Sequence, residues 1–281
     1  MRLGEIPRDQ GEAVMLIGHV AVRAPFPWRH MLDYFAHRLI PEFERIENDC
    51  YVRRVGARTI TVGYDPATSQ LRVAANGRVK ADQVLHNVGR LLDVSYDAER
   101  IHKHLRRSPV LKRRIANVPG MRPLGAWSPF ELCVRTILGQ QVTVAAAGTL
   151  MRRLVERCGS VTPECVADAN FVSFGMPGKR VETIRTFARA AAEGRVDFEQ
   201  PWSEIETALK ALPGFGPWTR AYLAIRLGRD PDAFPETDLG LIRAAQVDSP
   251  AQLLKLADAW RPYRAYAATY LWAVSENSTG M

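Results

Sequence analysis

The segment Leu212–Pro217, with the sequence LPGFGP, constrains the fold of this chain more than any other. Apolar residues recur at helical spacing before it, over 203–211, and again after it, over 218–227. Two glycines and two prolines among six residues do not continue a helix, and glycine lets another backbone come close. The pattern therefore predicts two helices joined by a short hairpin.

The predicted hairpin has two interpretations. Its backbone N–H groups and the N-terminus of the second helix form a natural binding site for phosphate. The alternative is a plain turn between two helices, and the short glycine pattern does not choose between them. The residues that follow the hairpin do.

Asp238 stands directly before the run LGLIRAA, at the N-terminus of a short predicted helix. The helix dipole favours the charged form of an acid at this place. An ordinary N-cap is the alternative for an isolated aspartate. Glu236 is the other acid that could act here, but it is less well placed against the helix.

Two motifs combine in this region. LPGFGPWT is followed by Tyr222 and, after a spacer, by PETDLGL. Together they resemble the helix-hairpin-helix DNA glycosylase superfamily, which carries one essential aspartate beyond its hairpin. The order of ILGQQVTVAAA, FGMPGKR, the hairpin, PETDLGL and YLWAV is similar to that of the alkylation-repair branch, 3-methyladenine DNA glycosylase II.

The first part of the chain alternates like strands and contains two helical runs, 28–39 and 80–93. We predict a small α+β domain with an antiparallel sheet over residues 1–105. An all-α helix-hairpin-helix glycosylase domain is expected over residues 106–281. Near its start, Ser128-Pro129-Phe130-Glu131 is typical of a capping box.

The chain is basic, with 38 Lys and Arg against 30 Asp and Glu and a net charge of +8. This balance suits a polyanionic partner without requiring one. Residues 100–122 contain eight Lys or Arg and no acid. A solvated linker and a phosphate-contacting segment are the two interpretations, and we expect a mixture of both.

The four cysteines form no C-x-x-C pair; they are Cys50, Cys133, Cys158 and Cys165. They indicate reduced thiols in a cytoplasmic protein. The iron–sulfur loop of endonuclease III relatives needs further cysteines, so we expect no such cluster and no required cofactor. The sequence has no apolar run long enough to span a membrane, so no membrane partner is expected.

The resemblance implies the chemistry of the site. Asp238 is the predicted catalytic residue, whose charge stabilises positive charge on the sugar as the glycosidic bond breaks. Trp218, Tyr222 and Trp272 match the aromatic residues of the base pocket, and aromatic faces attract positively charged alkylated purines. Lyase relatives carry a catalytic lysine two residues after the second hairpin glycine. Trp218 stands there, so no lyase activity is expected.

The resemblance also assigns roles to the hairpin. It predicts DNA contacts by Gly214, Phe215, Gly216 and Thr219. It further implies a structural monovalent cation, Na⁺ or K⁺, held by the backbone oxygens of Lys210, Leu212 and Phe215.

An apolar wedge must fill the gap that a flipped base leaves in the duplex. The family takes it from the segment before Ser128, where Leu124 is our prediction and Pro123 the alternative. Gln140 and Gln141 have two equally weighted interpretations. They face substrate or DNA, or they are buried and hydrogen-bonded amides.

These features predict a monofunctional DNA glycosylase that acts as a monomer on damaged double-stranded DNA. It would flip out N-alkylated bases, such as 3-methyladenine and 7-methylguanine, and excise them by hydrolysis. One alternative is a glycosylase for deaminated or oxidised bases. Another is a non-enzymatic helix-hairpin-helix DNA-binding protein, against which Asp238 and the aromatic residues argue because a binder needs neither.

Overall fold

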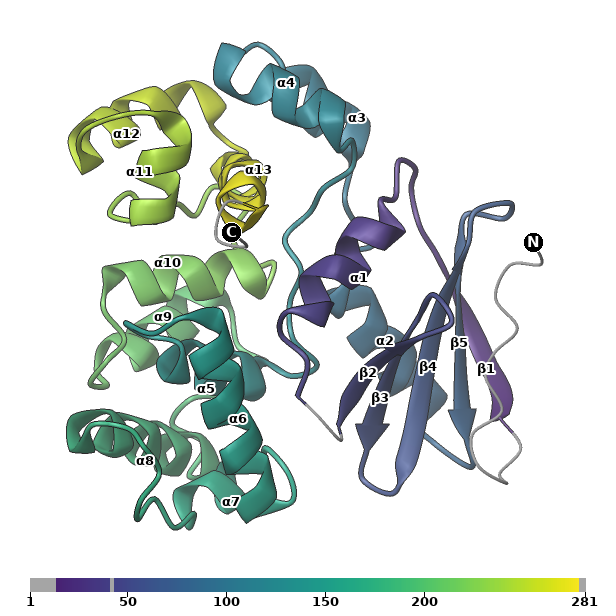
Figure 1. Cartoon of the computed structure of the whole chain (residues 1–281), viewed down its shortest axis with the longest axis vertical. Helices are drawn as coiled ribbons and strands as arrows, with labels where there is room; N and C mark the ends of the chain where they lie inside the picture. The colour runs from purple at the N-terminus through teal and green to yellow at the C-terminus, as the bar shows by residue number, and fades with distance from the viewer. Residues whose placement is uncertain (1–13, 41–42, 278–281) are drawn as a thin grey trace.

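The computed structural model describes residues 14–40 and 43–277. A sheet unit and a helical unit lie side by side in it (Figure 1). The sheet is antiparallel, with the strand order β1-β5-β4-β3-β2. Its strands are β1 Val14–Ala21, β2 Glu44–Glu47, β3 Cys50–Val55, β4 Arg58–Asp65 and β5 Gln70–Asn76.

Helices make up most of the remaining described chain. They are α1 Trp28–Ala36, α2 Ala81–Leu91, α3 Ala98–Leu105, α4 Pro109–Asn117, α5 Pro129–Leu138, α6 Val144–Cys158, α7 Pro163–Ala167, α8 Gly178–Ala192, α9 Trp202–Lys210, α10 Pro217–Arg226, α11 Leu239–Ala245, α12 Pro250–Ala257, the short 3₁₀ helix η1 Asp258–Trp260, and α13 Arg264–Asn277. Within the described ranges, no helix has the length and apolar character needed to cross a membrane.

The sheet unit confirms the predicted α+β fold with an antiparallel sheet. Helices α1 and α2 lie between the sheet and the helical unit (Figure 1). Their buried residues, such as Met31 and Val88, join the inward residues Val62 and Leu71 in one core. Strand β2 was not predicted, because its four residues are too few to show an alternating pattern.

The basic segment 100–122 is not a linker, since it forms most of α3 and all of α4, while its phosphate contact stays a prediction. Its apolar residues Ile101 and Leu105, and likewise Leu111 and Ile115, are four apart and fully buried. Most of the charged residues between them are exposed, such as Lys103 and Lys112, and their charges obscured this short helical period. The prediction therefore rested on the charges and did not include the buried apolar residues of these two helices.

His102 belongs to this core as well. Its Nε2 lies 2.8 Å from the hydroxyls of both Tyr96 and Tyr270. Burial, followed by the nearby charges of Arg106 and Arg122, lowers the pKa of His102 to about 4. The ring is therefore neutral near pH 7 and joins α3 to α13 through hydrogen bonds.

The predicted division between residues 105 and 106 stays a prediction, because the two units share their cores around it. Tyr96 and Ile101 already pack with the last helices, in a cluster with Trp260. Further along the chain, Leu124 and Trp127 return to the core of the sheet unit. The chain thus passes from one unit to the other and back before α5 begins.

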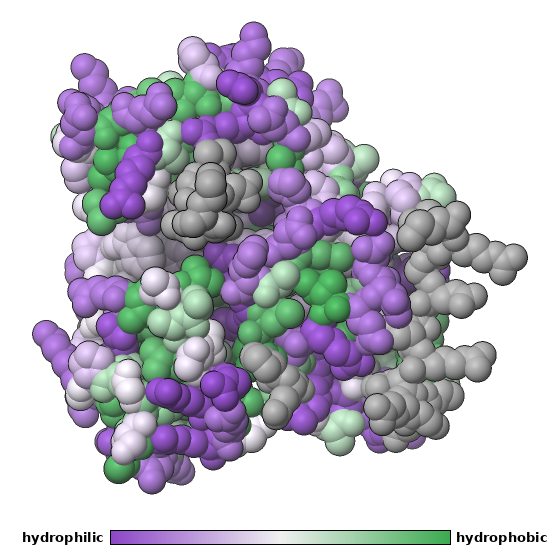
Figure 2. All heavy atoms as spheres, viewed as in Figure 1, coloured by the Kyte–Doolittle hydropathy of each residue, from purple (hydrophilic) through white to green (hydrophobic). Residues whose placement is uncertain are grey.

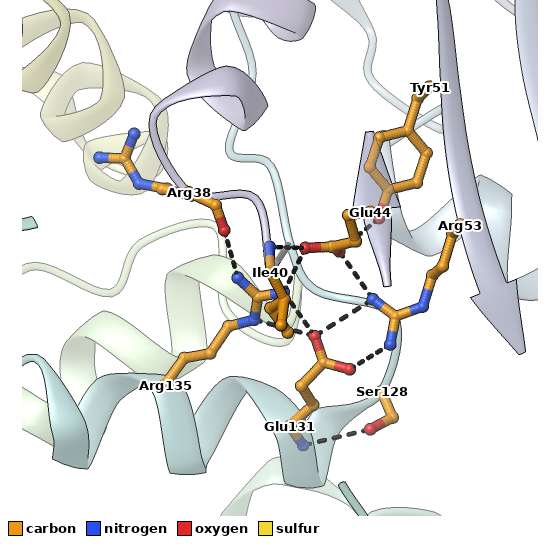
Figure 3. Close-up of polar contacts among 8 residues, drawn as sticks. All are labelled: Arg38, Ile40, Glu44, Tyr51, Arg53, Ser128, Glu131 and Arg135. Carbon is orange, nitrogen blue, oxygen red and sulfur yellow. Dashed lines mark hydrogen bonds and ion pairs between the residues drawn. The ribbon is translucent and has the colours of Figure 1, made fainter. Parts of the chain in front are cut away.

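A buried ion cluster joins the two units (Figure 3). Arg53 of β3 binds Glu44 of β2, with 2.7 Å between Nη1 and Oε1, and also binds Glu131 of α5. Arg135 of α5 binds Glu44 at 2.7 Å and Glu131 at 2.8 Å. Ser128 Oγ accepts the Glu131 N–H, but the Glu131 carboxylate is committed to the arginines. The predicted capping box is therefore only half formed.

The cluster makes stability depend on pH. Burial alone would raise the pKa of the Glu44 carboxyl, but the charges of Arg135 and Arg53 and a hydrogen bond from Tyr51 lower it from 4.5 to about 2. Between these values the unfolded chain binds a proton at Glu44 that the folded protein does not. The stabilisation is therefore complete above pH 4.5 and is lost as the pH falls toward 2.

We expect Glu44→Gln to lower the free energy of unfolding at pH 7 by about 3 kcal/mol, because two buried guanidinium groups then lose a shared carboxylate. The difference from the wild type should shrink as the pH falls from 4.5 toward 2, where the wild-type carboxyl is protonated. Urea unfolding at several pH values measures both effects. Glu47→Gln, in an exposed pair with Arg45 on the same strand, should cost less than about 0.5 kcal/mol. A Glu44→Gln loss that did not change with pH would contradict this explanation.

Candidate active site

Asp238 is the N-cap of α11, as its place in the sequence predicts. Its Oδ1 accepts a 2.8 Å hydrogen bond from the backbone N–H of Leu241. The side chain is half-buried. By itself this geometry is an ordinary helix cap, so the other groups around the carboxylate must decide whether it does more.

Two tryptophans donate to the same carboxylate. Trp218 Nε1 of α10 lies 2.8 Å from Asp238 Oδ2, and Trp272 Nε1 of α13 lies 3.2 Å from Oδ1. Hydrogen bonds to an ionised acceptor are stronger than neutral ones and fix its orientation. Three helices thus hold one carboxylate. The two indole hydrogen bonds were not predicted, because both tryptophans were assigned only as stacking surfaces for the base.

The predicted aromatic residues do come together around Tyr222, which contacts both tryptophans. Trp218 stacks on it with 5.2 Å between ring centroids and 12° between planes. The Arg226 guanidinium lies 5.3 Å from the Tyr222 centroid. These three residues follow one another at one-turn spacing on α10, so their side chains are neighbours on one face of the helix. Burial raises the pKa of the Tyr222 hydroxyl, which is therefore neutral near pH 7.

A cleft of about 220 Å³ opens beside these rings, between the two units. Trp218 and Tyr222 line it from the helical unit, and Tyr34 of α1 and Arg38, two residues beyond the end of α1, line it from the sheet unit. Figure 2 shows hydrophobic residues on both sides of the boundary between the units. No site residue was predicted in the sheet unit, because no local pattern around Tyr34 indicates that it lies at a cleft.

The hairpin has the predicted shape, although only one glycine needs its special freedom. Gly214 has a φ of +82°, and a Cβ there would lie 2.5 Å from Thr183 Cγ2 of α8. Gly216 has an ordinary φ of −63° and an open surrounding. Both glycines are exposed, so their backbone is accessible to a phosphate.

Two of the predicted DNA contacts have buried side chains and need correction. Phe215 is 2% exposed and packs on Phe187, with 5.1 Å between ring centroids. Thr219 is 4% exposed, and its hydroxyl donates to the Gly214 carbonyl at 3.4 Å. These side chains hold the hairpin in shape, and only their backbone atoms remain as candidates for a DNA contact.

Gln140 is the hydrogen-bonded amide of its two interpretations. Its Nε2 donates to the Gly214 carbonyl at 2.9 Å and to Thr219 Oγ1 at 3.2 Å. Gln141 is different, since it is exposed and has a left-handed φ of +57°. The loop after α5 is thus fixed to the hairpin through Gln140.

The predicted monovalent cation does not fit the hairpin. Arg220 Nη1 donates to the Phe215 carbonyl at 2.7 Å, so one of the three expected ligand oxygens already carries a positive group. Two unit charges about 4 Å apart repel by about 1 kcal/mol in water and about 4 kcal/mol at an effective dielectric constant of about 20. Glu206, 3.2 Å from Arg220 Nε, offsets part of this, but the oxygen is still poorly suited to a second cation.

Both residues predicted for the wedge are buried in this structure. Leu124 is 4% exposed and packs in the core of the sheet unit, while its carbonyl accepts a 3.2 Å hydrogen bond from Arg226 Nη1. The alternative, Pro123, is buried too. A wedge must be exposed to reach the duplex, so the burial of both side chains does not support either residue as the wedge. Exposed apolar side chains lie instead at Val142 and Val144, which line the cleft and are 37% and 47% exposed.

Comparison with known proteins assigns both units. The family model described as the AlkA N-terminal domain matches residues 18–128, and that of the HhH-GPD superfamily base excision DNA repair protein matches residues 134–271. DNA-3-methyladenine glycosylase 2 of Escherichia coli is 30% identical, over 88% of this chain and 94% of that protein. The chain belongs to the DNA-3-methyladenine glycosylase 2 family.

Other relatives agree with the family. A probable bifunctional transcriptional activator/DNA repair enzyme AlkA of Mycobacterium tuberculosis is 31% identical over 91% of this chain. The chain spans 56% of the length of that relative.

Solved structures share the fold of this family member. A 3-methyladenine DNA glycosylase from Archaeoglobus fulgidus has a TM-score of 0.79 at 18% identity, over 94% of this chain and all of that one. A Schizosaccharomyces pombe 3-methyladenine DNA glycosylase in complex with abasic DNA is 25% identical, with a TM-score of 0.57 over 63% of this chain and 97% of that one.

We expect Gly214→Ala to destabilise the family fold here by about 1–3 kcal/mol, because φ is left-handed and the new methyl group meets Thr183. Gly216→Ala is the matched control and should cost much less, since its φ is ordinary and its surroundings are open. Thr183→Ser removes the methyl group that clashes and should restore part of the loss in the double variant. Chemical unfolding of the wild type, Gly214→Ala, Gly216→Ala and the Gly214→Ala/Thr183→Ser double variant tests this. Equal losses of unfolding free energy for Gly214→Ala and Gly216→Ala would contradict it.

Proposed function

We propose that this protein is a monofunctional DNA glycosylase that excises N-alkylated bases, such as 3-methyladenine and 7-methylguanine, from duplex DNA. One observation carries the proposal. The Asp238 carboxylate is held by two indole N–H groups and a helix N-terminus, and one of those indoles, that of Trp218, lines the cleft. Membership of the DNA-3-methyladenine glycosylase 2 family supports the same activity.

The cleft suits a base taken out of the helical stack. A purine alkylated on a ring nitrogen carries positive charge, and electron-rich rings attract it. Because Tyr222 stacks on one face of Trp218, the face of Trp218 turned away from Tyr222 is the stacking surface that we assign to the base. Alkylation has already weakened the glycosidic bond, so this cleft need not recognise each lesion in detail.

Asp238 acts on the sugar in this mechanism. The C1′–N bond breaks with its electron pair going to the departing base, and positive charge develops on the sugar. The fixed carboxylate stabilises that charge. A water molecule then adds its oxygen to C1′ and releases a proton to Asp238 or to solvent, which completes hydrolysis.

No lyase step is part of the proposal. Such a step needs an amine to attack C1′. Trp218 occupies the place where lyase relatives carry that lysine, and its N–H is bound to Asp238. Water is therefore the nucleophile.

We assign the gap-filling role to the loop that carries Gln141 and Val142, together with Val144 at the start of α6. It is exposed, borders the cleft and is joined to the hairpin through Gln140. One chain supplies Asp238, both tryptophans and the hairpin, so we propose a monomer. We also propose a cytoplasmic location, where the four free thiols would stay reduced.

We expect Asp238→Asn to slow base release at least about a hundredfold, because it removes the charge that stabilises the transition state. Single-turnover release of 3-methyladenine and 7-methylguanine from methylated duplex DNA measures this. Asp248→Asn removes an exposed aspartate and should leave the rate unchanged. Equal rates for Asp238→Asn and the wild type would overturn the catalytic assignment.

The same reactions test the monofunctional mechanism. Wild-type protein should leave the sugar–phosphate strand intact unless alkali is added, and borohydride should trap no protein–DNA adduct. A trapped adduct would contradict the proposed use of water.

We expect Trp272→Phe to slow base release by about tenfold to a hundredfold. The variant keeps an aromatic ring but loses the N–H bond to Asp238, and a hydrogen bond to a charged group is worth about 1.5–3 kcal/mol. Trp202→Phe, on α9, is the control and should keep the wild-type rate. A wild-type rate in Trp272→Phe would mean that only the ring matters.

A further inference from the structure

Arg220 fixes a positive charge against the hairpin. Its Nη1 donates to the Phe215 carbonyl at 2.7 Å, and its Nε donates to Glu206 Oε1 at 3.2 Å. The side chain is only 15% exposed, whereas that of Glu206 is 45% exposed. The guanidinium therefore joins α9, the hairpin and α10 in one arrangement.

We propose that Arg220 takes the place of the monovalent cation at this hairpin, as a charge attached to the chain. The grip of the hairpin on DNA would then be independent of which monovalent cation is in solution. This inference rests on the proposed function only in taking duplex DNA as the partner.

The oxygen that Arg220 occupies carries the argument. A bound alkali ion would need the Phe215 carbonyl, and the guanidinium already holds that oxygen. Glu206 holds the guanidinium from the other side, so its position is fixed before DNA arrives. An ion would have to be recruited from solution, whereas this charge cannot dissociate.

The Arg220 guanidinium can also donate hydrogen bonds to a phosphate. A guanidinium has five N–H groups, and the two contacts described here use two of them. Its planar fork matches the oxygens of a phosphate. The exposed backbone of Gly214 and Gly216 lies on either side of Phe215, so a phosphate bound at the hairpin would approach this charge.

A hairpin with a bound alkali ion and a hairpin with the Arg220 guanidinium differ in how their DNA binding responds to the salt in solution. Screening by salt weakens any phosphate contact, so ionic strength must be held constant. At constant ionic strength, an alkali-ion site distinguishes K⁺, Na⁺ and Li⁺ by size and hydration and does not accept tetramethylammonium. A guanidinium makes no such distinction.

Fluorescence anisotropy with a duplex that contains a stable abasic-site analogue tests the proposal. Binding is measured at one ionic strength in the chlorides of K⁺, Na⁺, Li⁺ and tetramethylammonium. Wild-type Kd should agree within about twofold in all four salts. Arg220→Ala should bind about tenfold more weakly in tetramethylammonium chloride and regain part of that loss in K⁺ or Na⁺, because the Phe215 oxygen is then open to an ion.

Two further variants serve as controls. Arg195→Ala removes the same charge from an exposed pair with Glu193 and should leave binding close to that of the wild type in every salt. Arg220→Lys keeps the charge and should keep the independence of cation identity.

A wild-type Kd that changes tenfold between K⁺ and tetramethylammonium would overturn the inference, and so would an Arg220→Ala variant whose Kd ignores the cation. The wild-type series decides the matter even if Arg220→Ala fails to fold. Failure to bind duplex DNA in any salt would instead overturn the proposed function and this inference together. If the wild type released bases but its DNA binding depended on K⁺ or Na⁺, the proposed function would stand and only the inference about Arg220 would be overturned.

Discussion

The buried cluster of Glu44, Arg53, Glu131 and Arg135 determines how the two units stand against each other. Charges removed from water are costly unless each is paired, so the cluster permits one arrangement of β2, β3 and α5 and penalises others. Arg135 Nη1 also donates to the Arg38 carbonyl beyond the end of α1 at 2.7 Å. That bond fixes α1, and with it Tyr34, at the edge of the cleft. The width of the candidate site thus depends on an ion pair network that touches no substrate.

The carboxylate of Asp238 depends in turn on helix packing. Its donors come from α10, α11 and α13, whose apolar residues, including Leu241 and Leu271, lie in one core. Because rigid helices carry the donors, the charge is oriented before a substrate binds. Such preorganisation stabilises a developing cation more effectively than a mobile acid would.

The hairpin obtains its rigidity from contacts on every side. Gly214 packs against Thr183 with no room for a side chain. Gln140 donates a hydrogen bond to the Gly214 carbonyl, and Arg220 donates one to the Phe215 carbonyl. Phe215 faces inward to the core. The two glycines and the two prolines of the hairpin remain exposed, and in the proposed function their backbone would contact phosphate, which carries no information about base sequence. A repair enzyme that must search all sequences needs such a contact.

The sequence by itself determined the helix-hairpin-helix, the N-cap position of Asp238 and most strands and helices, because these depend on residue spacing, glycine and proline nearby in the chain. It also brought Trp218, Tyr222 and Trp272 into one prediction through the family motif. Only the tertiary structure decided that Leu124 is buried, that Glu131 leaves its helix cap for Arg53, that Tyr34 joins the cleft and that Arg220 occupies the Phe215 oxygen. Burial and pairing depend on which surfaces meet, and residues 53 and 131, which are 78 positions apart, meet only after the chain has folded.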